Sequence, residues 1–287
     1  MEILRVENLT FAYPETENAA LSDVSFSVNV GDFTVLCGRS GCGKTTLLRL
    51  LKKELSPVGK TQGEIFFKGQ KLTEIDAKTS ASKIGFVMQN PESQTVTDKV
   101  WHELAFGLEN LGLPTGEIRR RVAETASYFG ISDWFRKRTD ELSGGQKQIL
   151  ALASVMVMHP DILLLDEPTS QLDPIAAADF IATLKKLNRE LGITVITAEH
   201  RLEEIFPVAD KVMVMDGGKL EAFAPPEKIG TLLPETHPIK KALPSATRIA
   251  LSLGKKDDLP LTVRDGKTYL EENFKKSEKP LEIMEYT

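Results

Sequence analysis

Residue types that would indicate a special environment are scarce in this 287-residue sequence. It has two cysteines, Cys37 and Cys42, too few for a disulfide framework and without histidine or cysteine neighbours at zinc-ligand spacing. We expect two free thiols in a reducing compartment. Basic residues (36) are outnumbered by acidic ones (41), and the net charge of −5 argues against a broad electrostatic contact with nucleic acid. We therefore expect no nucleic-acid partner.

Long hydrophobic runs are missing as well. No stretch approaches the roughly 18–20 apolar residues that cross a bilayer. The most apolar run, 149–158, ends at His159-Pro160 and is typical of a buried helix. The first seven residues alternate like a strand and do not resemble a signal-peptide core. We expect a chain that does not cross a membrane by itself and that buries a sizeable core.

Strand-like and helix-like segments alternate along most of the chain. Alternating apolar residues over 3–30 predict a small antiparallel sheet with a turn at 14–18. Short apolar runs typical of buried strands occur at 33–37, 83–88, 162–165, 194–198 and 211–215. Helical patterns occur at 45–55, 100–111, 115–129, 143–158 and 174–191. The order predicts an α/β fold with a largely parallel sheet.

Two changes in pattern divide the chain further. Residues from about 91 to 160 are mainly helical and are predicted to form a helical subdomain inserted into the α/β core. After residue 225, prolines punctuate a lysine-rich segment with one or two short predicted helices. We therefore assign 1–225 to one domain, with an N-terminal antiparallel β subdomain, and 226–287 to a small C-terminal extension.

The strongest chemical signal is a glycine-rich loop that follows one predicted strand and opens the next helix. It matches the phosphate-loop pattern, in which backbone N–H groups turn inward around phosphates. Lys44 is expected to contact the β- and γ-phosphates, and the Thr45 hydroxyl to complete a Mg²⁺ shell. A chance glycine-rich turn is the alternative. ATP and Mg²⁺ are the expected ligands, and the expected ATP-binding residues are Gly38, Arg39, Ser40, Gly41, Cys42, Gly43, Lys44, Thr45 and Thr46.

Two adjacent carboxylates, Asp166 and Glu167, follow the buried run 162–165. Open α/β sheets bind ligands at the carboxyl ends of their strands. Asp166 is expected to hold Mg²⁺ through water, and Glu167 to orient and deprotonate the attacking water. A solvated acidic loop end is the alternative.

The segment 142–146 opens another helix with a capping box, formed by Ser143 and Gln146. Gly144 and Gly145 weaken the first helical turn by about 1 kcal/mol each relative to alanine. They are explained if the N–H groups there must approach an anionic phosphate closely.

Together with His200, these motifs resemble the nucleotide-binding subunit of ATP-binding cassette (ABC) proteins over about residues 2–225. The resemblance implies a P-loop NTPase (RecA-like) core. Tyr13 matches the residue that stacks on adenine, with a strand-surface tyrosine as the alternative. Gln89 matches the glutamine that senses the metal and the attacking water. His200 matches the histidine that contacts the γ-phosphate; a structural histidine is its alternative.

The resemblance also implies a head-to-tail dimer. In this family the serine–glycine helix end of one subunit closes on ATP held by the phosphate loop of the other. The residues that would reach the partner's ATP are Ser143, Gly144, Gly145, Gln146 and Asp173. Cys42 stands where the family often has a small residue, and we expect it to make the protein sensitive to thiol reagents.

A narrower resemblance is to the ATPases of energy-coupling factor (ECF) transporters, which take up vitamins, cobalt or nickel. It depends on 89–94, 103–114, 199–201 and 259–264. It implies an ATPase at the cytoplasmic side of the cell membrane. The implied partners are a second ATPase subunit (the same chain or a paralogue), a membrane scaffold protein and a membrane substrate-binding subunit. A surface groove would accept amphipathic coupling helices of the scaffold.

Three other functions compete with this one. The chain could serve another class of ABC transporter, or be a soluble ABC ATPase that acts on nucleic acid or ribosomes. The separation of 99 positions from Lys44 to Ser143 leaves no room for the long coiled coil of the chromosome-maintenance type. A regulator without turnover is disfavoured by the presence of Glu167 and His200.

Overall fold

The computed structural model describes residues 1–16 and 18–274. Its N-terminal part is an antiparallel sheet in the order β2-β1-β4-β5. The strands are β1 (Glu2–Ala12), β2 (Leu21–Asn29), β4 (Lys60–Phe67) and β5 (Gln70–Lys71). Apolar residues alternate with polar ones in β2, and the apolar ones are buried. The sheet confirms the predicted antiparallel β subdomain.

The second sheet has six strands in the order β10-β9-β3-β8-β7-β6. The strands are β3 (Phe33–Gly38), β6 (Ile84–Val87), β7 (Ile162–Asp166), β8 (Thr194–Ala198), β9 (Lys211–Asp216) and β10 (Lys219–Ala224). All neighbours pair in parallel except β9 and β10. Every residue of β3, β7 and β8 is buried, as the continuous apolar runs predicted. The carboxyl ends of these three neighbouring strands therefore meet at one edge.

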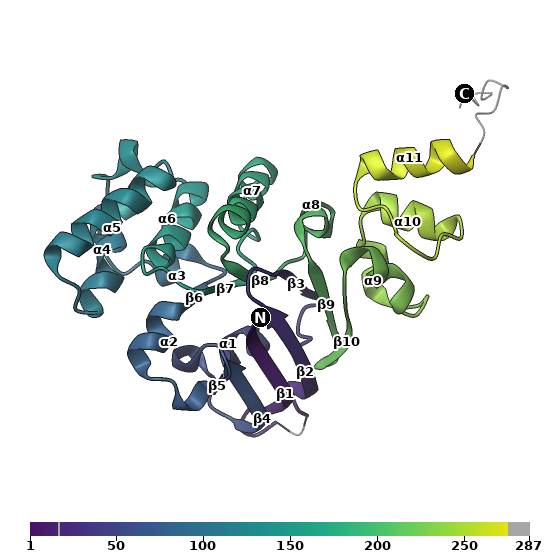
Figure 1. Cartoon of the computed structure of the whole chain (residues 1–287), viewed down its shortest axis with the longest axis horizontal. Helices are drawn as coiled ribbons and strands as arrows, with labels where there is room; N and C mark the ends of the chain where they lie inside the picture. Colours follow the sequence, from purple (N-terminus) through teal and green to yellow (C-terminus); the bar gives the residue numbers. More distant parts are fainter. Residues whose placement is uncertain (17, 275–287) are drawn as a thin grey trace.

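Separate hydrophobic cores cover the two faces of this sheet. Leu164 faces a core shared with α1 (Lys44–Leu50) and the antiparallel sheet. Leu163 and Leu165 face a core with the helices of the opposite side. Those helices include α6 (Gly144–Met156), α7 (Pro174–Leu191) and α8 (Leu202–Ile205). Figure 1 shows this layering, with α1 between the two sheets and α6, α7 and α8 on the other side.

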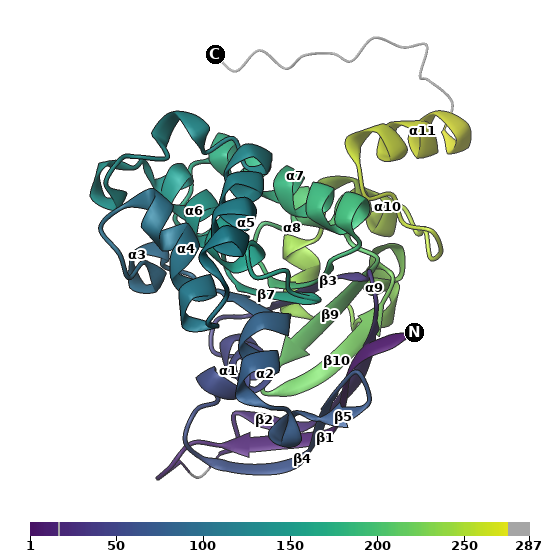
Figure 2. The same ribbon diagram turned by 60° about the vertical axis from the view of Figure 1, so that its left-hand side comes forward.

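The helical block lies beside β6, at one end of the six-stranded sheet (Figure 1), and Figure 2 shows its helices gathered on one side of the molecule. It contains α3 (Pro91–Gln94), α4 (Val100–Asn110), α5 (Thr115–Tyr128) and the start of α6. Leu104, Leu108 and Trp134 belong to a third core inside the block. The α4, α5 and α6 helices agree with the predicted ones to within two residues at each end, while α7 matches its prediction at both ends.

Some elements differ from the prediction. The first helix ends at Leu50 instead of continuing to residue 55, because Lys52 is drawn inward and its ammonium donates to the carbonyls of Ser80 and Ile84, each at 2.7 Å. Helix α2 (Ala77–Lys83) was not predicted, since it has no apolar stripe and is marked only by its Asp76 N-cap. Short 3₁₀ turns lie at Lys53–Leu55, Leu72–Glu74, Ser132–Trp134, Thr139–Glu141, Phe206–Val208 and Pro238–Ala242.

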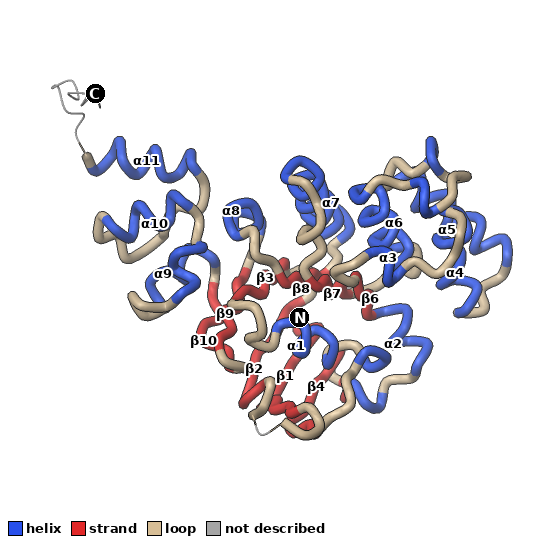
Figure 3. The backbone as a smooth tube through the Cα atoms, turned by 180° about the vertical axis from the view of Figure 1, so that it is seen from behind, coloured by secondary structure: helices blue, strands red, loops and turns tan. Residues whose placement is uncertain are grey.

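Within its described residues, 226–274, the C-terminal segment forms three α-helices rather than one or two: α9 (Pro226–Leu232), α10 (Ser245–Ser252) and α11 (Val263–Asn273). Figure 3 shows them at the β10 end of the sheet, far from α4 and α5. The predicted extension also includes 275–287, which lie outside the described residues. Among the described residues, no helix combines the length and apolar character needed to cross a membrane.

Candidate functional site

The glycine-rich loop joins β3 to α1 in the centre of the sheet. Gly43 has φ +102°, and a Cβ there would lie 2.7 Å from the Ala20 carbonyl oxygen, so only glycine fits. The following Lys44 is buried, and its Nζ donates to the carbonyl oxygens of Gly38 (3.0 Å) and Arg39 (3.2 Å). The loop therefore wraps around its own ammonium group, where a phosphate would be held.

Thr45 and Asp166 meet at the carboxyl ends of β3 and β7. The Thr45 hydroxyl donates to Asp166 Oδ1 at 3.0 Å. Burial raises the pKa of the Asp166 carboxyl. Together with Gln89, the two residues line a cavity of about 310 Å³. Hydroxyl, carboxylate and amide oxygens are the donors that Mg²⁺ prefers, so the three predicted metal residues fit the ion chemically.

Glu167 is the point at which the predicted catalytic residues meet. His200 Nε2 lies 2.7 Å from its Oε1, and Gln89 Nε2 donates to Oε2 at 3.2 Å. Lys44 Nζ lies 3.7 Å from the same Oε1. Three residues that are distant in sequence therefore surround one carboxylate. The backbone of Glu167 has φ +47°, a left-handed conformation that costs a non-glycine residue on the order of 1–3 kcal/mol.

Tyr13 lies near the first turn of α1. Its hydroxyl is 3.0 Å from Thr46 Oγ1, and the edge of its ring packs against Phe11 at a centroid distance of 4.9 Å. Tyr13 is 36% exposed, so part of its side chain is available to a ligand. The position is compatible with both alternatives stated for this residue.

Ser143 and Asp173 form a second cluster, apart from the phosphate loop. The predicted capping box is present: Ser143 Oγ accepts from the Gln146 N–H (3.3 Å), and Gln146 Oε1 accepts from the Ser143 N–H (3.0 Å). Asp173 caps α7, and a Cβ on Gly145 would lie 3.5 Å from Ala176 of that helix. Within 1–16 and 18–274, no hydrogen bond or ion pair joins this cluster to residues 38–46.

Two residues that were not predicted as site residues form hydrogen bonds to the loop that follows Glu167. Glu199 is 2% exposed, and its carboxylate accepts two hydrogen bonds from Thr169. Arg201 donates to the Leu172 carbonyl oxygen at 2.9 Å. An acidic residue directly after the buried strand 194–198 is a signal that could have identified Glu199.

Both cysteines are free, as expected, and both are buried. The predicted sensitivity to thiol reagents does not fit this environment. Burial raises the pKa of Cys37 to about 12, and burial also raises the pKa of Cys42, which is only 4% exposed. Since the thiolate is the reactive form, we now expect both thiols to react slowly.

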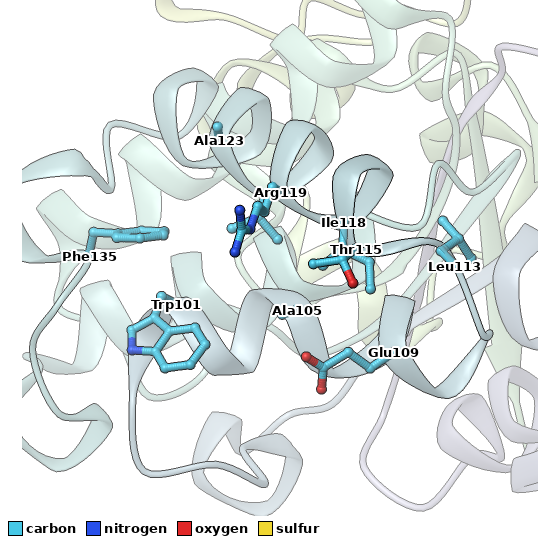
Figure 4. Close-up of a pocket in the computed structure, with 10 residues that line it drawn as sticks. Trp101, Ala105, Glu109, Leu113, Thr115, Ile118, Arg119, Ala123 and Phe135 are labelled. Atoms are coloured by element: carbon cyan, nitrogen blue, oxygen red, sulfur yellow. The ribbon is translucent and has the colours of Figure 1, made fainter.

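A larger cavity, of about 710 Å³, lies away from these residues between α4 and α5. Figure 4 shows Trp101 and Phe135 at one end and Leu113 at the other, with Glu109 along the lower side. None of the predicted site residues lines it. Cavity size alone would therefore misplace the site, which is defined by converging polar side chains.

Comparison with known proteins agrees with this geometry. The model of the ABC transporter family matches residues 21–170. A putative ABC transporter ATP-binding protein of Bacillus cereus is 46% identical over 260 residues, which cover 91% of this chain and 47% of that protein. This chain spans about half the length of such Bacillus relatives.

Two further proteins are similar over most of their own length. The energy-coupling factor transporter ATP-binding protein EcfA1 of Streptococcus mutans is 37% identical over 84% of this chain and 89% of its own. The solved structure of cbiO1 from Clostridium perfringens, part of the ABC transporter complex cbiONQ, has a TM-score of 0.72 and 34% identity, covering 79% of this chain and 90% of that one. This chain thus belongs to the ABC transporter family and is one of its ATP-binding cassettes.

Proposed function

We propose that the chain binds ATP with Mg²⁺ and hydrolyses the bond to the γ-phosphate, with Glu167 as general base. The observation that supports this most is the set of contacts to the Glu167 carboxylate. His200 and Gln89, the two residues proposed to sense the γ-phosphate and the attacking water, each hydrogen-bond to one of its oxygens. A general base must reach both the water and the groups that position the phosphate.

For the reaction to occur, contacts to Glu167 must be replaced by contacts to the bound nucleotide. Lys44 and His200 would turn from Glu167 to oxygens of the bound γ-phosphate, which leaves a Glu167 oxygen free to accept a proton from water. The water oxygen then bonds to phosphorus as the bond to the β-phosphate oxygen breaks, and ADP leaves. Mg²⁺ bound near Thr45, Gln89 and Asp166 would neutralise charge on the phosphate oxygens. Backbone N–H groups of 38–46 would hold the same oxygens.

We also propose that a second cassette completes the site. Ser143 and Gly144 are exposed, and they lie in a cluster that makes no hydrogen bond to the phosphate loop of the same described chain. A Cβ on Gly144 would meet nothing within 4 Å, so packing within the chain does not require glycine there. Close approach of another molecule explains it, and the N–H groups of the first helical turn suit a phosphate. Asp173, near this cluster, would cross the same interface.

The finer proposal is an importer of the energy-coupling factor type, with the cassette bound at the cytoplasmic side of the membrane. The resemblance to EcfA1 and to cbiO1 of the cbiONQ complex supports it. So does a groove of about 530 Å³ between α2 and α4, lined in part by Ala77, Ala81, Phe106 and Leu111. An amphipathic helix of a membrane scaffold protein would fit such an apolar groove. A separate membrane subunit would bind the vitamin or metal ion.

Two adjacent residues at the end of α4 provide a test of the docking groove. Asn110 lines the groove and Glu109 lines the cavity of Figure 4, and both are exposed. We expect Asn110→Trp to release the cassette from membranes without loss of hydrolysis in solution, and Glu109→Trp to remain bound. The measurement is co-purification from membranes with identification of every bound protein. Equal binding of both variants would contradict the groove as the docking site.

The same preparation separates the competing functions. A scaffold and a small substrate-binding membrane protein among the bound subunits would support the importer. Other membrane subunits would indicate a different class of ABC transporter. Strong stimulation of hydrolysis by DNA or ribosomes, with no membrane partner, would overturn the transporter assignment.

A further inference from the structure

The segment 199–201, which includes His200, is hydrogen-bonded to the loop 168–173 at two points. We infer that Glu199 and Arg201 are positioning residues that couple the placement of His200 to that of Asp173. The inference rests on the proposed hydrolysis and goes beyond it. His200 would serve the nucleotide of its own chain, and Asp173 would reach the interface, so the coupling would connect the two sites of a dimer.

The first attachment is the Glu199 carboxylate. The Thr169 hydroxyl lies 2.9 Å from each carboxylate oxygen, and the Thr169 N–H donates to Oε1 at 3.2 Å. The His200 N–H donates to Oε2 at 3.3 Å. One side chain thus holds the backbone of His200 and of the loop after Glu167. Glu199 and Thr169 are both fully or almost fully buried, so water does not replace these bonds readily.

The chemistry of this attachment requires a carboxylate. Three donors face Glu199, and an ionised carboxylate only accepts. No ion pair of Glu199 occurs in the described part of the chain, so hydrogen bonds alone compensate its burial. Glutamine would direct an N–H group at one of the donors. The Thr169 hydroxyl can rotate to accept, whereas the Thr169 N–H and the His200 N–H cannot, so one of these two backbone hydrogen bonds is lost.

The second attachment lies on the other side of His200. Arg201 Nη2 donates to the Leu172 carbonyl oxygen at 2.9 Å, and Leu172 directly precedes Asp173. Asp173 is itself fixed as the N-cap of α7, where its carboxylate accepts from Ile175 and Ala176 N–H groups at 3.0 Å. Between the two attachments, the His200 ring contacts Glu167 at 2.7 Å. A shift of His200 toward a phosphate would therefore move the loop that carries Asp173.

Two matched pairs of variants test the coupling. Thr169→Val keeps the shape of the side chain but removes the hydroxyl, and Thr169→Ser keeps the hydroxyl but removes a methyl group. Glu199→Gln is paired with Glu103→Gln, because Glu103 is also buried and accepts two backbone N–H groups (3.1 and 2.8 Å), but lies in the helical block.

We expect Thr169→Val and Glu199→Gln to lower kcat about tenfold, the effect of one lost charge-assisted hydrogen bond. KM for ATP should stay within about twofold of wild type, and the Hill coefficient for ATP should fall toward 1 because the sites no longer communicate. Thr169→Ser and Glu103→Gln should retain the wild-type Hill coefficient. Equal damage by valine and serine, or an unchanged Hill coefficient in Glu199→Gln, would overturn the inference.

Hydrogen exchange of the nucleotide-free chain separates this inference from the proposed function. Glu199→Gln should speed the exchange of amides in 168–173 and 199–203, and Glu103→Gln should do so only near 95–99. A wild-type chain that hydrolyses no ATP would refute the proposed function. The exchange data would still show whether Glu199 holds the loop 168–173 in place. Unchanged exchange in 168–173 would overturn it independently of any activity.

Discussion

The carboxylate of Glu167, which is proposed to deprotonate water, is already contacted by an ammonium, an imidazole and an amide. Each contact fixes its position, and each also competes with the water for its oxygens. Nucleotide binding would resolve this competition, because the phosphate oxygens attract the same cationic and donor groups. The exchange of partners explains how a base can be held ready without acting prematurely.

Glu167→Gln tests the base directly. Glutamine keeps the shape of the side chain but cannot take a proton, so we expect ATP affinity to be retained and hydrolysis to fall by roughly 10²–10⁴-fold. The variant should accumulate as an ATP-bound dimer, detectable by light scattering. Phosphate release at a near-normal rate would remove Glu167 from this role.

Lys44→Ala provides the contrasting control. Because Lys44 Nζ sits among the loop carbonyls where phosphates are expected, its removal should abolish ATP binding itself. Unchanged nucleotide affinity in this variant would contradict the phosphate-binding assignment.

Asp166 makes a prediction about pH. Its pKa is raised by burial above the ordinary value of 3.8, so the folded chain binds the proton more tightly than the unfolded chain. That contribution to stability is present below the ordinary pKa and is lost as pH rises through the raised one. Asp166→Asn lacks this loss. Without nucleotide or Mg²⁺, the free energy of unfolding of Asp166→Asn should therefore increase relative to that of the wild type as pH rises from the ordinary pKa through the raised one.

Urea unfolding of both proteins at a series of pH values measures the difference. Asparagine can still accept from Thr45, so the hydrogen bond at 3.0 Å is preserved in the comparison. A difference that is constant with pH, or that grows in favour of the wild type, would contradict the raised pKa.

In the first turn of α6, one substitution should affect stability and hydrolysis in opposite ways. Gly144 faces open space in its own chain, so Gly144→Ala should leave the free energy of unfolding unchanged or increase it by up to about 1 kcal/mol. If this helix end must approach a partner's ATP closely, the methyl group should nonetheless lower hydrolysis at least tenfold. Thermal unfolding and phosphate release on the same preparation check both parts. Full activity of a stable Gly144→Ala protein would contradict the close approach.

Elements with a regular apolar pattern could be predicted from the sequence, whereas elements without one could not. The strand 194–198 and the helix 174–191 were predicted with their observed bounds, because apolar periodicity and the caps Asp173 and Gly192 define them locally. Helix α2 has no apolar stripe, and the early end of α1 depends on contacts of Lys52 with a distant segment. Tertiary contacts decide such cases.

The candidate site followed the same division. Asp166 and the phosphate loop were identified from local motifs. That His200 and Gln89 belong to the same site as Glu167 was implied only by a family resemblance, because strand order brings together segments that are separated in sequence. Glu199 and Arg201 were not predicted as site residues, because their roles depend on contacts that only the fold creates. Glu199 contacts Thr169, and Arg201 contacts the Leu172 carbonyl oxygen.

The whole molecule holds the parts of an ATP site in two places. The phosphate loop, Asp166 and Glu167 lie at the carboxyl edge of the sheet, and Ser143 and Gly144 lie in a separate exposed cluster. In the proposed dimer, the phosphate loop of one cassette and the Ser143–Gly144 cluster of the other form one site. This arrangement would make hydrolysis depend on dimer closure, which a membrane partner bound near α4 could control.

Mixing two inactive variants tests this claim most directly. One chain carries Lys44→Ala and the other Gly144→Arg, and each is expected to be inactive alone. A mixed dimer would contain one complete site, built from the intact phosphate loop of one chain and the intact helix end of the other. Half of the dimers in an equal mixture are mixed and each has one complete site of two, so we predict recovery of phosphate release to at most about a quarter of the wild-type rate. Full activity of Gly144→Arg alone, or a mixture as inactive as its components beside an active wild type, would contradict the shared site.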